Sequence, residues 1–397
     1  MAALITIEEA QRLVLARARA AEAEPVPLGA AAGRWAAEAA RAAVDLPPFP
    51  SSAMDGFAVR AADTPGRLTV AESVAAGRPA ARALAAGEAF AISTGGVVPH
   101  GADAVVPVEH VARDANTIEV AEGVRVGAHV REPGRDAVAG DVVVEAGERI
   151  TPARLGALGA AGVAELRCAR RPRAVVLGTG TELRRPGAAL APGEVYEANG
   201  VMLAAGLRAA GAEVEVLDPV ADDEDAHRAA LARGLDADLL VTSGGVSVGP
   251  HDLVRRVLGE LGVEEVFWRV AVKPGKPVGF GVRGASFWFG LPGNPVSSLV
   301  GLELFVLPAV RALQGARDPL PRYAVARLGA PLARNPARDE LVRADVRWDD
   351  GELVAHPLSG QESHMIVRAA RANALVHVAR GEGALDAGTT VRYLPLG

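Results

Sequence analysis

Lysine is confined to one short segment of this chain. Of the 42 lysine and arginine residues only Lys273 and Lys276 are lysines, and both lie in VKPGKP, residues 272–277. A proline follows each lysine, which stiffens the backbone and removes amide donors. Lysine is a compact point charge, whereas arginine is a planar fork. The segment predicts a site for a confined oxyanion or phosphate, with chance retention of lysine as the alternative.

A glycine-rich segment, SGGVSVGPHD (243–252), lies between a predicted strand and a predicted helix. Ligands of open α/β sheets bind beyond the carboxyl ends of strands, and helix N-termini favour anions. Gly244 and Gly245 would let a phosphate approach the backbone closely. A P-loop is excluded because Pro250 and His251 stand where Lys and Ser or Thr are required. Another kind of anion site and a tight turn both remain open.

Two further loops follow predicted strands of the same region. LGTGTEL (177–183) places the carboxylate of Glu182 beside Thr179, but Leu183 occupies the third glycine position of a dinucleotide fingerprint. GLPGNPVSS (290–298) forms a rigid turn before a long apolar helix. Each loop is compatible with anion binding, and a capping acid or an ordinary turn is the alternative.

Three loops in the first third of the chain carry polar residues between prolines and glycines. Taken singly, each is compatible with an ordinary surface turn. Their polar residues of interest are Asp55, Thr94 and Asp136. The loops are PPFPSSAMDGFAV (47–59), STGGVVPHGADAVVPVEH (93–110) and REPGRDAVAGD (131–141).

The metal ligands that the sequence offers are carboxylates. The eight histidines show no HExxH spacing, and no GxSxG nucleophile motif stands out. Asp222, Asp223 and Asp252 lie at predicted helix starts, where helix capping is the alternative role. Carboxylates suit a hard cation such as Mg²⁺. Phosphates, Mg²⁺ and oxyanions therefore form one coherent chemical theme.

Composition narrows the class of protein. The chain has 397 residues and a net charge of -6, without a long basic tract, so a general nucleic-acid-binding surface is not expected. Cys168 is the only cysteine, which excludes an intrachain disulfide and a thiolate metal cluster. The N-terminus does not read as a signal peptide, and no stretch reaches about 18 uninterrupted apolar residues. We expect a cytoplasmic protein of about two to four domains that does not bind a membrane.

The pattern of elements changes along the chain. Residues 1–22 predict a helix capped by Thr6, and residues 24–41 predict a second helix. Short strands follow to about residue 140, and Thr151-Pro152 starts another helix. Strands and helices alternate over residues 172–313, which predicts a mainly parallel sheet. The last 75 or so residues return to β character.

In this order, the quoted motifs resemble the molybdopterin molybdenumtransferase family, called MoeA in bacteria and related to the gephyrin E domain. The resemblance covers almost the whole chain. It implies an elongated α/β plus β chain with a mainly parallel α/β pterin-nucleotide domain, a β-rich inserted domain and a C-terminal β-barrel-like domain. The expected domains are 1–22 with 172–317 (α/β), 23–44 with 141–171 (linking), 45–140 (β-rich) and 318–397 (C-terminal).

The resemblance also implies an activity. Such enzymes insert molybdenum from molybdate into adenylylated molybdopterin and release AMP in a Mg²⁺-dependent step. They are homodimers whose active site is shared between subunits, and a contact with the molybdopterin adenylyltransferase would suit this role. The preference for molybdate or tungstate is left open.

Site residues carry over by motif. The implied catalytic residues are Asp55, Thr94, Asp136, Glu182, Asp252, Lys273 and Lys276. The implied substrate- and phosphate-binding residues are Thr179, Gly180, Ser243, Gly244, Gly245, Ser247, Pro292, Gly293, Asn294, Pro295 and Ser363. The implied Mg²⁺ ligands are Glu182, Asp222, Asp223 and Asp252.

The chain departs from the family pattern at Pro50-Ser51, where Asp-Asn is frequent, and at Arg269, where some relatives have lysine. One alternative is the adenylyltransferase that makes the substrate, or a CinA-like nucleotide hydrolase. Both lack the 47–59 segment and the terminal β domain. A second alternative is a scaffold that binds peptides without turnover.

Overall fold

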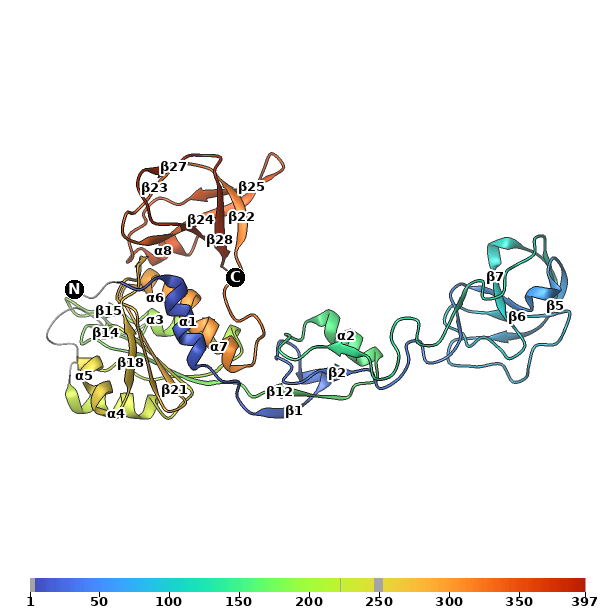
Figure 1. Ribbon diagram of the computed structural model, residues 1–397, viewed down its shortest axis with the longest axis horizontal. Helices are drawn as coiled ribbons and strands as arrows, with labels where there is room; N and C mark the ends of the chain where they lie inside the picture. Colours follow the sequence, from blue (N-terminus) through green and yellow to red (C-terminus); the bar gives the residue numbers. More distant parts are fainter. Residues whose placement is uncertain (1–3, 222, 246–252, 397) are drawn as a thin grey trace.

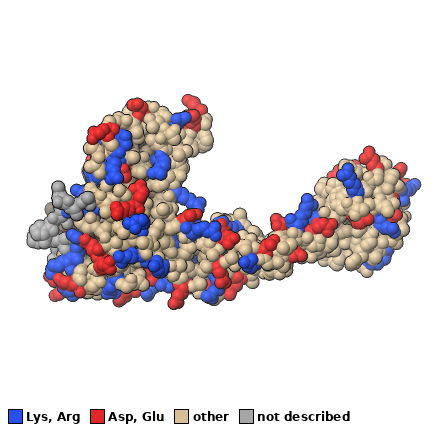
Figure 2. Space-filling model, in the orientation of Figure 1, with Lys and Arg blue, Asp and Glu red and all other residues tan. Residues whose placement is uncertain are grey.

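The computed structural model describes residues 4–221, 223–245 and 253–396, and the molecule is elongated (Figure 1). An α/β domain and a β-barrel lie together at one end, a small linking domain lies in the middle, and a β-rich domain lies at the far end. Both signs of charge are interspersed over the face shown in Figure 2.

A six-stranded mixed sheet forms the α/β domain. Its first four strands are parallel, which confirms the sheet that the strand–helix alternation predicts. The strand β20 runs antiparallel to both of its neighbours, β21 and β18, because the chain enters and leaves it through connections too short for a crossover helix. In spatial order the strands are β16 (Glu213–Val216), β13 (Arg173–Gly178), β17 (Leu239–Ser243), β21 (Ser286–Leu291), β20 (Gly279–Arg283) and β18 (Glu264–Trp268).

Helices cover both faces of this sheet. One core contains α1, α3 and the long helix formed by α6, the π-helical η4 and α7, and the other contains α4 and α5. The predicted capping of α1 is confirmed, because the Glu9 amide donates to Thr6 Oγ1 at 3.0 Å. The helices are α1 (Ile7–Arg17), α3 (Asn199–Ala209), α4 (Glu224–Gly234), α5 (Leu253–Glu260), α6 (Pro295–Gly301), η4 (Leu302–Val306) and α7 (Leu307–Leu313).

One helix of the described chain, Pro295–Leu313, is long and apolar enough by composition to cross a membrane. Most of it is buried here, against α1 and α3, as the core helix of a folded domain would be. Its apolar character is therefore explained by the core it builds.

The C-terminal region forms a closed five-stranded barrel, because β24 pairs with both β25 and β26. The short strand β19 (Val272–Lys273), which contains the first lysine, pairs in parallel with β24. The barrel strands are β22 (Ala324–Leu328), β24 (Asp339–Asp349), β25 (Glu352–Pro357), β26 (Ala374–Val378) and β28 (Thr390–Pro395). Short elements β23 (Leu332–Ala333), β27 (Ala384–Leu385) and α8 (Ile366–Ala369) complete the region.

The linking domain overturns one prediction. Residues 24–41 do not form a helix: β1 (Ala23–Pro27) pairs with β12 (Glu165–Ala169), and β2 (Ala40–Arg41) pairs with β11 (Val142–Val144). Alanine favours a helix locally, but Pro25 and Pro27 disfavour one, and pairing with a distant strand wins. The predicted helix after Thr151 is confirmed as α2 (Pro152–Ala160), with Arg154 N donating to Thr151 Oγ1.

The β-rich domain contains a second six-stranded sheet, as its alternating short segments predict. The strands are β7 (Ala104–Pro107), β4 (Gly56–Val59), β6 (Glu88–Ile92), β5 (Gly66–Val74), β9 (Thr117–Val120) and β8 (Val111–Asp114), with β3 (Ser51–Ser52) paired to β10 (Val130–Arg131) beside them.

Candidate functional site

Two adjoining cavities form one cleft between the α/β domain and the barrel. Their volumes are about 850 Å³ and about 590 Å³. The larger cavity lies at the carboxyl ends of β13, β17 and β21, where parallel sheets bind ligands. The smaller cavity lies between the lysine loop and the barrel. The two share the wall residues Pro277, Pro292, Asn294 and His364.

The larger cavity brings together the first two glycine loops. Because β13 and β17 are adjacent, the Thr179 amide donates to Ser243 O at 2.9 Å. Gly244 has a φ of +89°, and a Cβ at this position would lie 2.4 Å from Thr179 O. Only glycine fits at position 244, because the two backbones approach each other so closely. The missing side chain also leaves that edge of the cavity open to a ligand.

Asn199, which the sequence analysis missed, holds this edge together. Its Nδ2 donates to Ser243 Oγ at 2.8 Å and to Gly293 O at 2.7 Å, and only 8% of the residue is exposed. Ser243 Oγ in turn donates to Pro292 O at 3.3 Å. The network ties the end of β17 to the turn before α6. The only signal in the sequence was an asparagine at a helix start, which normally indicates a cap.

The carboxylates of this cavity are differently placed. Glu182 is exposed, its carboxylate lies against Gly180, and it has no hydrogen-bond or ion-pair partner among the described residues. Glu197 is buried and accepts a hydrogen bond from the Gly200 amide at 2.7 Å. Asp223 accepts from the Ala226 amide at 2.8 Å, so it caps α4, and it lines neither cavity.

The predicted residues Asp222, Ser247 and Asp252 lie outside the described residues. Among the residues that the structure does describe, no three His, Cys, Asp or Glu side chains gather into a metal-binding group. The Mg²⁺ site therefore stays a prediction. Glu182 is suited to such a site, because its carboxylate has no partner among the described residues at the cavity edge and Mg²⁺ prefers oxygen ligands.

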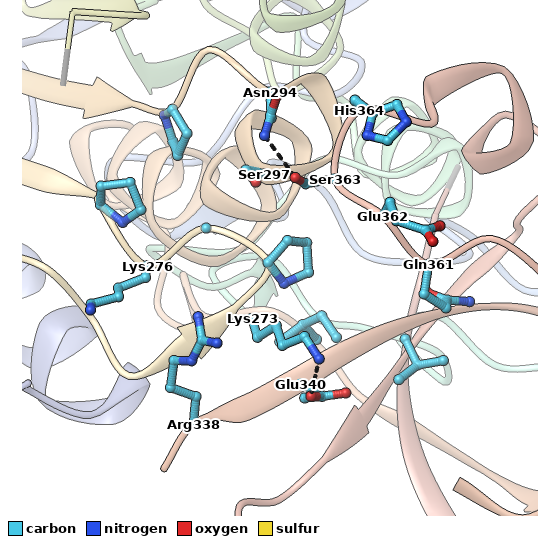
Figure 3. Close-up of a pocket in the computed structure, with 16 residues that line it drawn as sticks. Lys273, Lys276, Asn294, Ser297, Arg338, Glu340, Gln361, Glu362, Ser363 and His364 are labelled. Carbon is cyan, nitrogen blue, oxygen red and sulfur yellow. Dashed lines mark hydrogen bonds and ion pairs between the residues drawn. The ribbon is translucent and has the colours of Figure 1, made fainter. Parts of the chain in front are cut away.

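The smaller cavity contains both lysines (Figure 3). Lys273 Nζ forms an ion pair with Glu340 Oε1 on β24 at 2.8 Å, and the side chain of Lys276 has no hydrogen-bond or ion-pair partner within the described ranges. In Figure 3 the two lysine side chains leave the loop in different directions, Lys273 toward Glu340. Arg338 adds a third cation from the barrel. Arg269 does not line either cavity.

A barrel loop closes the other side of this cavity. Asn294 Nδ2 donates to Ser363 Oγ at 2.7 Å, and the Val296 amide donates to Ser363 O at 3.0 Å. These bonds connect the start of α6 to the barrel, and they place the predicted Ser363 in the cleft. Its neighbours Gln361, Glu362 and His364 also line the cavity and were not predicted.

The three loops of the β-rich domain meet one another but not the cleft. The Thr94 amide and hydroxyl donate to Asp55 Oδ1 at 2.7 and 3.1 Å. The bond from the amide, and to a smaller extent the bond from the hydroxyl, lowers the pKa of Asp55 below its ordinary value. Asp136 is exposed in the third loop, between β10 and β11, and its amide donates to Leu46 O. The pair of Asp55 and Thr94 belongs to the β-rich domain, which lies at the far end of the molecule from the cleft (Figure 1).

The chain is elongated, and the strand ends of its α/β sheet face a small barrel (Figure 1). This fold and the cleft between the two domains define a class of multidomain α/β proteins. Profiles of the MoeA N-terminal region (domain I and II), the probable molybdopterin binding domain and the MoeA C-terminal region (domain IV) match residues 5–162, 175–312 and 325–396. The chain belongs to the MoeA family of molybdopterin molybdenumtransferases, which are transferases.

Relatives match the chain over its length. Molybdopterin molybdenumtransferase 2 of Mycobacterium tuberculosis is 38% identical over 98% of this chain and 99% of its own. The Haemophilus influenzae molybdopterin molybdenumtransferase is 34% identical over 99% and 98%. Two solved structures of the MoeA protein from Pyrococcus horikoshii match with TM-scores of 0.82 and 0.85, at 31% and 27% identity, over 99% of this chain and 99% and 100% of theirs.

Proposed function

We propose that this chain inserts molybdenum from molybdate into adenylylated molybdopterin and releases AMP. One observation carries the proposal: a cavity lined by two lysines and an arginine shares a wall with a cavity lined by glycine loops at parallel strand ends. An oxyanion in the first cavity and a phosphate-bearing pterin in the second would lie next to each other. Enzymes named for this transfer match the whole chain.

The smaller cavity is suited to a compact dianion. Lys276 and Arg338 offer donors beside the Lys273–Glu340 ion pair, and charge-assisted hydrogen bonds to an oxyanion are among the strong ones. Molybdate would compete with Glu340 for Lys273. Once both substrates are bound, proximity of the dithiolene to molybdate and neutralisation of charge would supply much of the catalysis.

The larger cavity would hold the nucleotide end of the substrate. Its glycines leave the backbone accessible, and Asn199 keeps the walls at a constant separation through Ser243 and Gly293. Glu182, together with Asp252, would hold Mg²⁺, which when bound polarises the phosphate bond that breaks to release AMP. Asp223 is assigned to capping α4 and not to the metal, because its carboxylate already accepts an amide there.

The β-rich loops would complete the cleft of a partner subunit in a homodimer. Asp55 directly precedes β4 of the β-rich domain, Asp136 lies between β10 and β11, and neither lines the cleft of its own chain. Exposed apolar side chains precede β4 in the chain, including Val44, Phe49 and Met54, at 41%, 39% and 39%. Exposed apolar side chains of this kind are suited to burial against a second copy. The reaction would take place in the cytoplasm, with the adenylyltransferase as supplier of substrate.

The shared site can be tested by mixing two inactive variants. Asp55→Ala and Lys276→Ala subunits, unfolded together and refolded as mixed dimers, should recover about a quarter of the wild-type activity, because half the dimers then hold one intact site. Each variant alone should stay inactive. If the mixed dimers recovered no activity, a site shared between subunits would be contradicted.

The activity itself is tested with purified chain, adenylylated molybdopterin, molybdate and Mg²⁺. AMP release that requires molybdate supports the transferase. AMP release without molybdate would favour a nucleotide hydrolase, and binding without turnover would favour a scaffold. Lys276→Gln should abolish the molybdate-dependent release while Arg125→Gln, a charge loss on the exposed β-rich surface, should not.

A further inference from the structure

A third cavity, of about 470 Å³, lies where the linking domain, the α/β domain and the barrel meet. It shares no lining residue with the cleft. We propose that it binds a small dianion of the phosphate type, held by Arg149, Arg311, Arg317 and Arg322. The proposal is independent of the function proposed above.

Within the described part of the chain, the four arginines lack carboxylate partners. None of these four arginines has a carboxylate within 4.0 Å among the residues that the structure describes. The fifth arginine of the cavity, Arg154, is paired with Glu148 at 2.6 Å. Other arginines of the chain have a carboxylate partner, as in the pair of Arg170 with Asp238. What distinguishes this cavity is that four guanidinium groups without such a partner in the described ranges line the same space.

To the described residues, these four arginines make few side-chain hydrogen bonds, and those are long. Arg311 Nη1, Arg317 Nη2 and Arg149 Nε donate only to backbone carbonyl oxygens, at 3.3, 3.3 and 3.4 Å. Arg322 has no hydrogen-bond partner within the described ranges. Guanidinium groups carry five N–H donors each, so most donors here are available to a ligand, in the forked geometry that suits a phosphate.

The side chains that line this cavity carry a net positive charge. Against the four arginines, the cavity offers two carboxylates without an ion pair among the described residues, Glu303 and Asp318. The excess of two positive charges matches a dianion. Glu303 is half-buried on η4, where burial raises the pKa of its carboxyl. Burial lowers the pKa of Arg311, the charge of Glu303 acts in the opposite direction, and the charges of Arg149 and Arg322 lower the pKa further. The three arginines therefore lie close enough to repel one another, although Glu303 offsets part of that repulsion.

A bound dianion would relieve that repulsion and connect three parts of the molecule. Arg149 belongs to the linking domain, Arg311 to α7, and Arg322 to the segment that leads from α7 into the barrel (Figure 1). Trp35 and Leu394 contribute apolar walls from the linking domain and the barrel. Because the ligand would touch all three, its binding would hold the segment 317–322 in place and stabilise the orientation of the barrel.

Hydrogen exchange of the full-length chain, with and without inorganic phosphate at constant ionic strength, tests the site and its location. Phosphate should slow exchange of the backbone amides in 317–322. Arg322→Gln should require about tenfold more phosphate for the same protection, since one charge-assisted contact is lost. Arg322→Lys should lie between the two, and Arg125→Gln should behave as wild type.

Protection confined to the cleft segment 243–245, or an equal phosphate dependence in Arg322→Gln and Arg125→Gln, would overturn the proposal. Arg322 is exposed and holds no other residue, so its loss should leave folding intact. Arg149→Gln repeats the test from the linking domain, where the removed side chain has only one long hydrogen bond. Phosphate protection of 317–322 that survives both substitutions unchanged would equally overturn it.

Discussion

Lys273 and Glu340, 67 residues apart, face each other across the boundary between the α/β domain and the barrel. Their ion pair, 2.8 Å from Nζ to Oε1, follows from the parallel pairing of β19 with β24, in which these two residues are register partners. The side chain of Glu340 is 16% exposed and that of Lys273 is 49% exposed, so the carboxylate is the more deeply placed partner. In the structure, then, one of the two lysines already carries a counter-charge.

Removing that counter-charge should strengthen oxyanion binding. Glu340→Gln is expected to tighten molybdate binding by about three- to tenfold, on the order of 1 kcal/mol, because a partly exposed pair contributes about that much. Equilibrium dialysis with molybdate measures the effect, and Glu352→Gln on the exposed barrel surface is the control. Weaker binding in Glu340→Gln would instead assign Glu340 to orienting Lys273.

Lysine at position 276 should not be replaceable by arginine. Lys276→Arg retains the charge but replaces a compact ammonium with a planar fork, so we expect molybdate-dependent AMP release to fall by about tenfold or more. The ratio kcat/KM for molybdate is the quantity to measure. A Lys276→Arg enzyme as active as wild type would show that charge alone matters at this position.

Asn199 should contribute to stability and to the cleft together. Asn199→Ala leaves Ser243 Oγ and Gly293 O without their amide donor, which should lower the free energy of unfolding by about 1–3 kcal/mol. Chemical denaturation of Asn199→Ala beside Asn116→Ala, an exposed turn position, measures this. Equal stability of the two variants would remove Asn199 from the structural network.

Acid should destabilise the barrel through His377. Burial lowers the pKa of His377, although Asp339 acts in the opposite direction. The unfolded chain then binds the proton more readily, so stability is present above about pH 6.5 and is lost as pH falls toward the folded pKa. Between pH 7.5 and 5.5 the melting temperature of wild type should fall further than that of His377→Gln. Parallel curves for the two would exclude this residue as the source.

Local patterns predicted much of the fold. The alternation over 172–313 identified the strands of the α/β domain and most of its helices. Apolar residues recur every two residues in strands and about every 3.6 in helices, and this spacing is visible in a short stretch of sequence. The antiparallel edge formed by β20 and β18 was not predicted. It arises because the connections before and after β20 are too short for a crossover helix. The helix expected over 24–41 was wrong because β1 finds its partner β12 nearly 140 residues later. The four-domain division, with boundaries after residues 22, 44, 140, 171 and 317, stays a prediction.

The site was predictable where it depends on strand ends. Thr179 and Ser243 both lie at the ends of parallel strands, which the strand–helix alternation indicates, whereas the adjacency of β13 and β17 depends on the strand order that the structure shows. Arg338, Glu340 and His364 were missed because their strand and loop contact the cleft only after the barrel has closed. Asn199 was missed because its partners come from two other loops.

The sequence by itself determined which residues the chain could use: two lysines between prolines, glycines at strand ends, and a set of carboxylates. These features depend on side-chain type and on the backbone conformation of a few consecutive residues. Only the tertiary structure decided that Lys273 meets Glu340, and that Asp55 and Thr94 lie far from the lysines of their own chain. Those relationships depend on strand pairing and domain placement between distant segments, which no local pattern specifies.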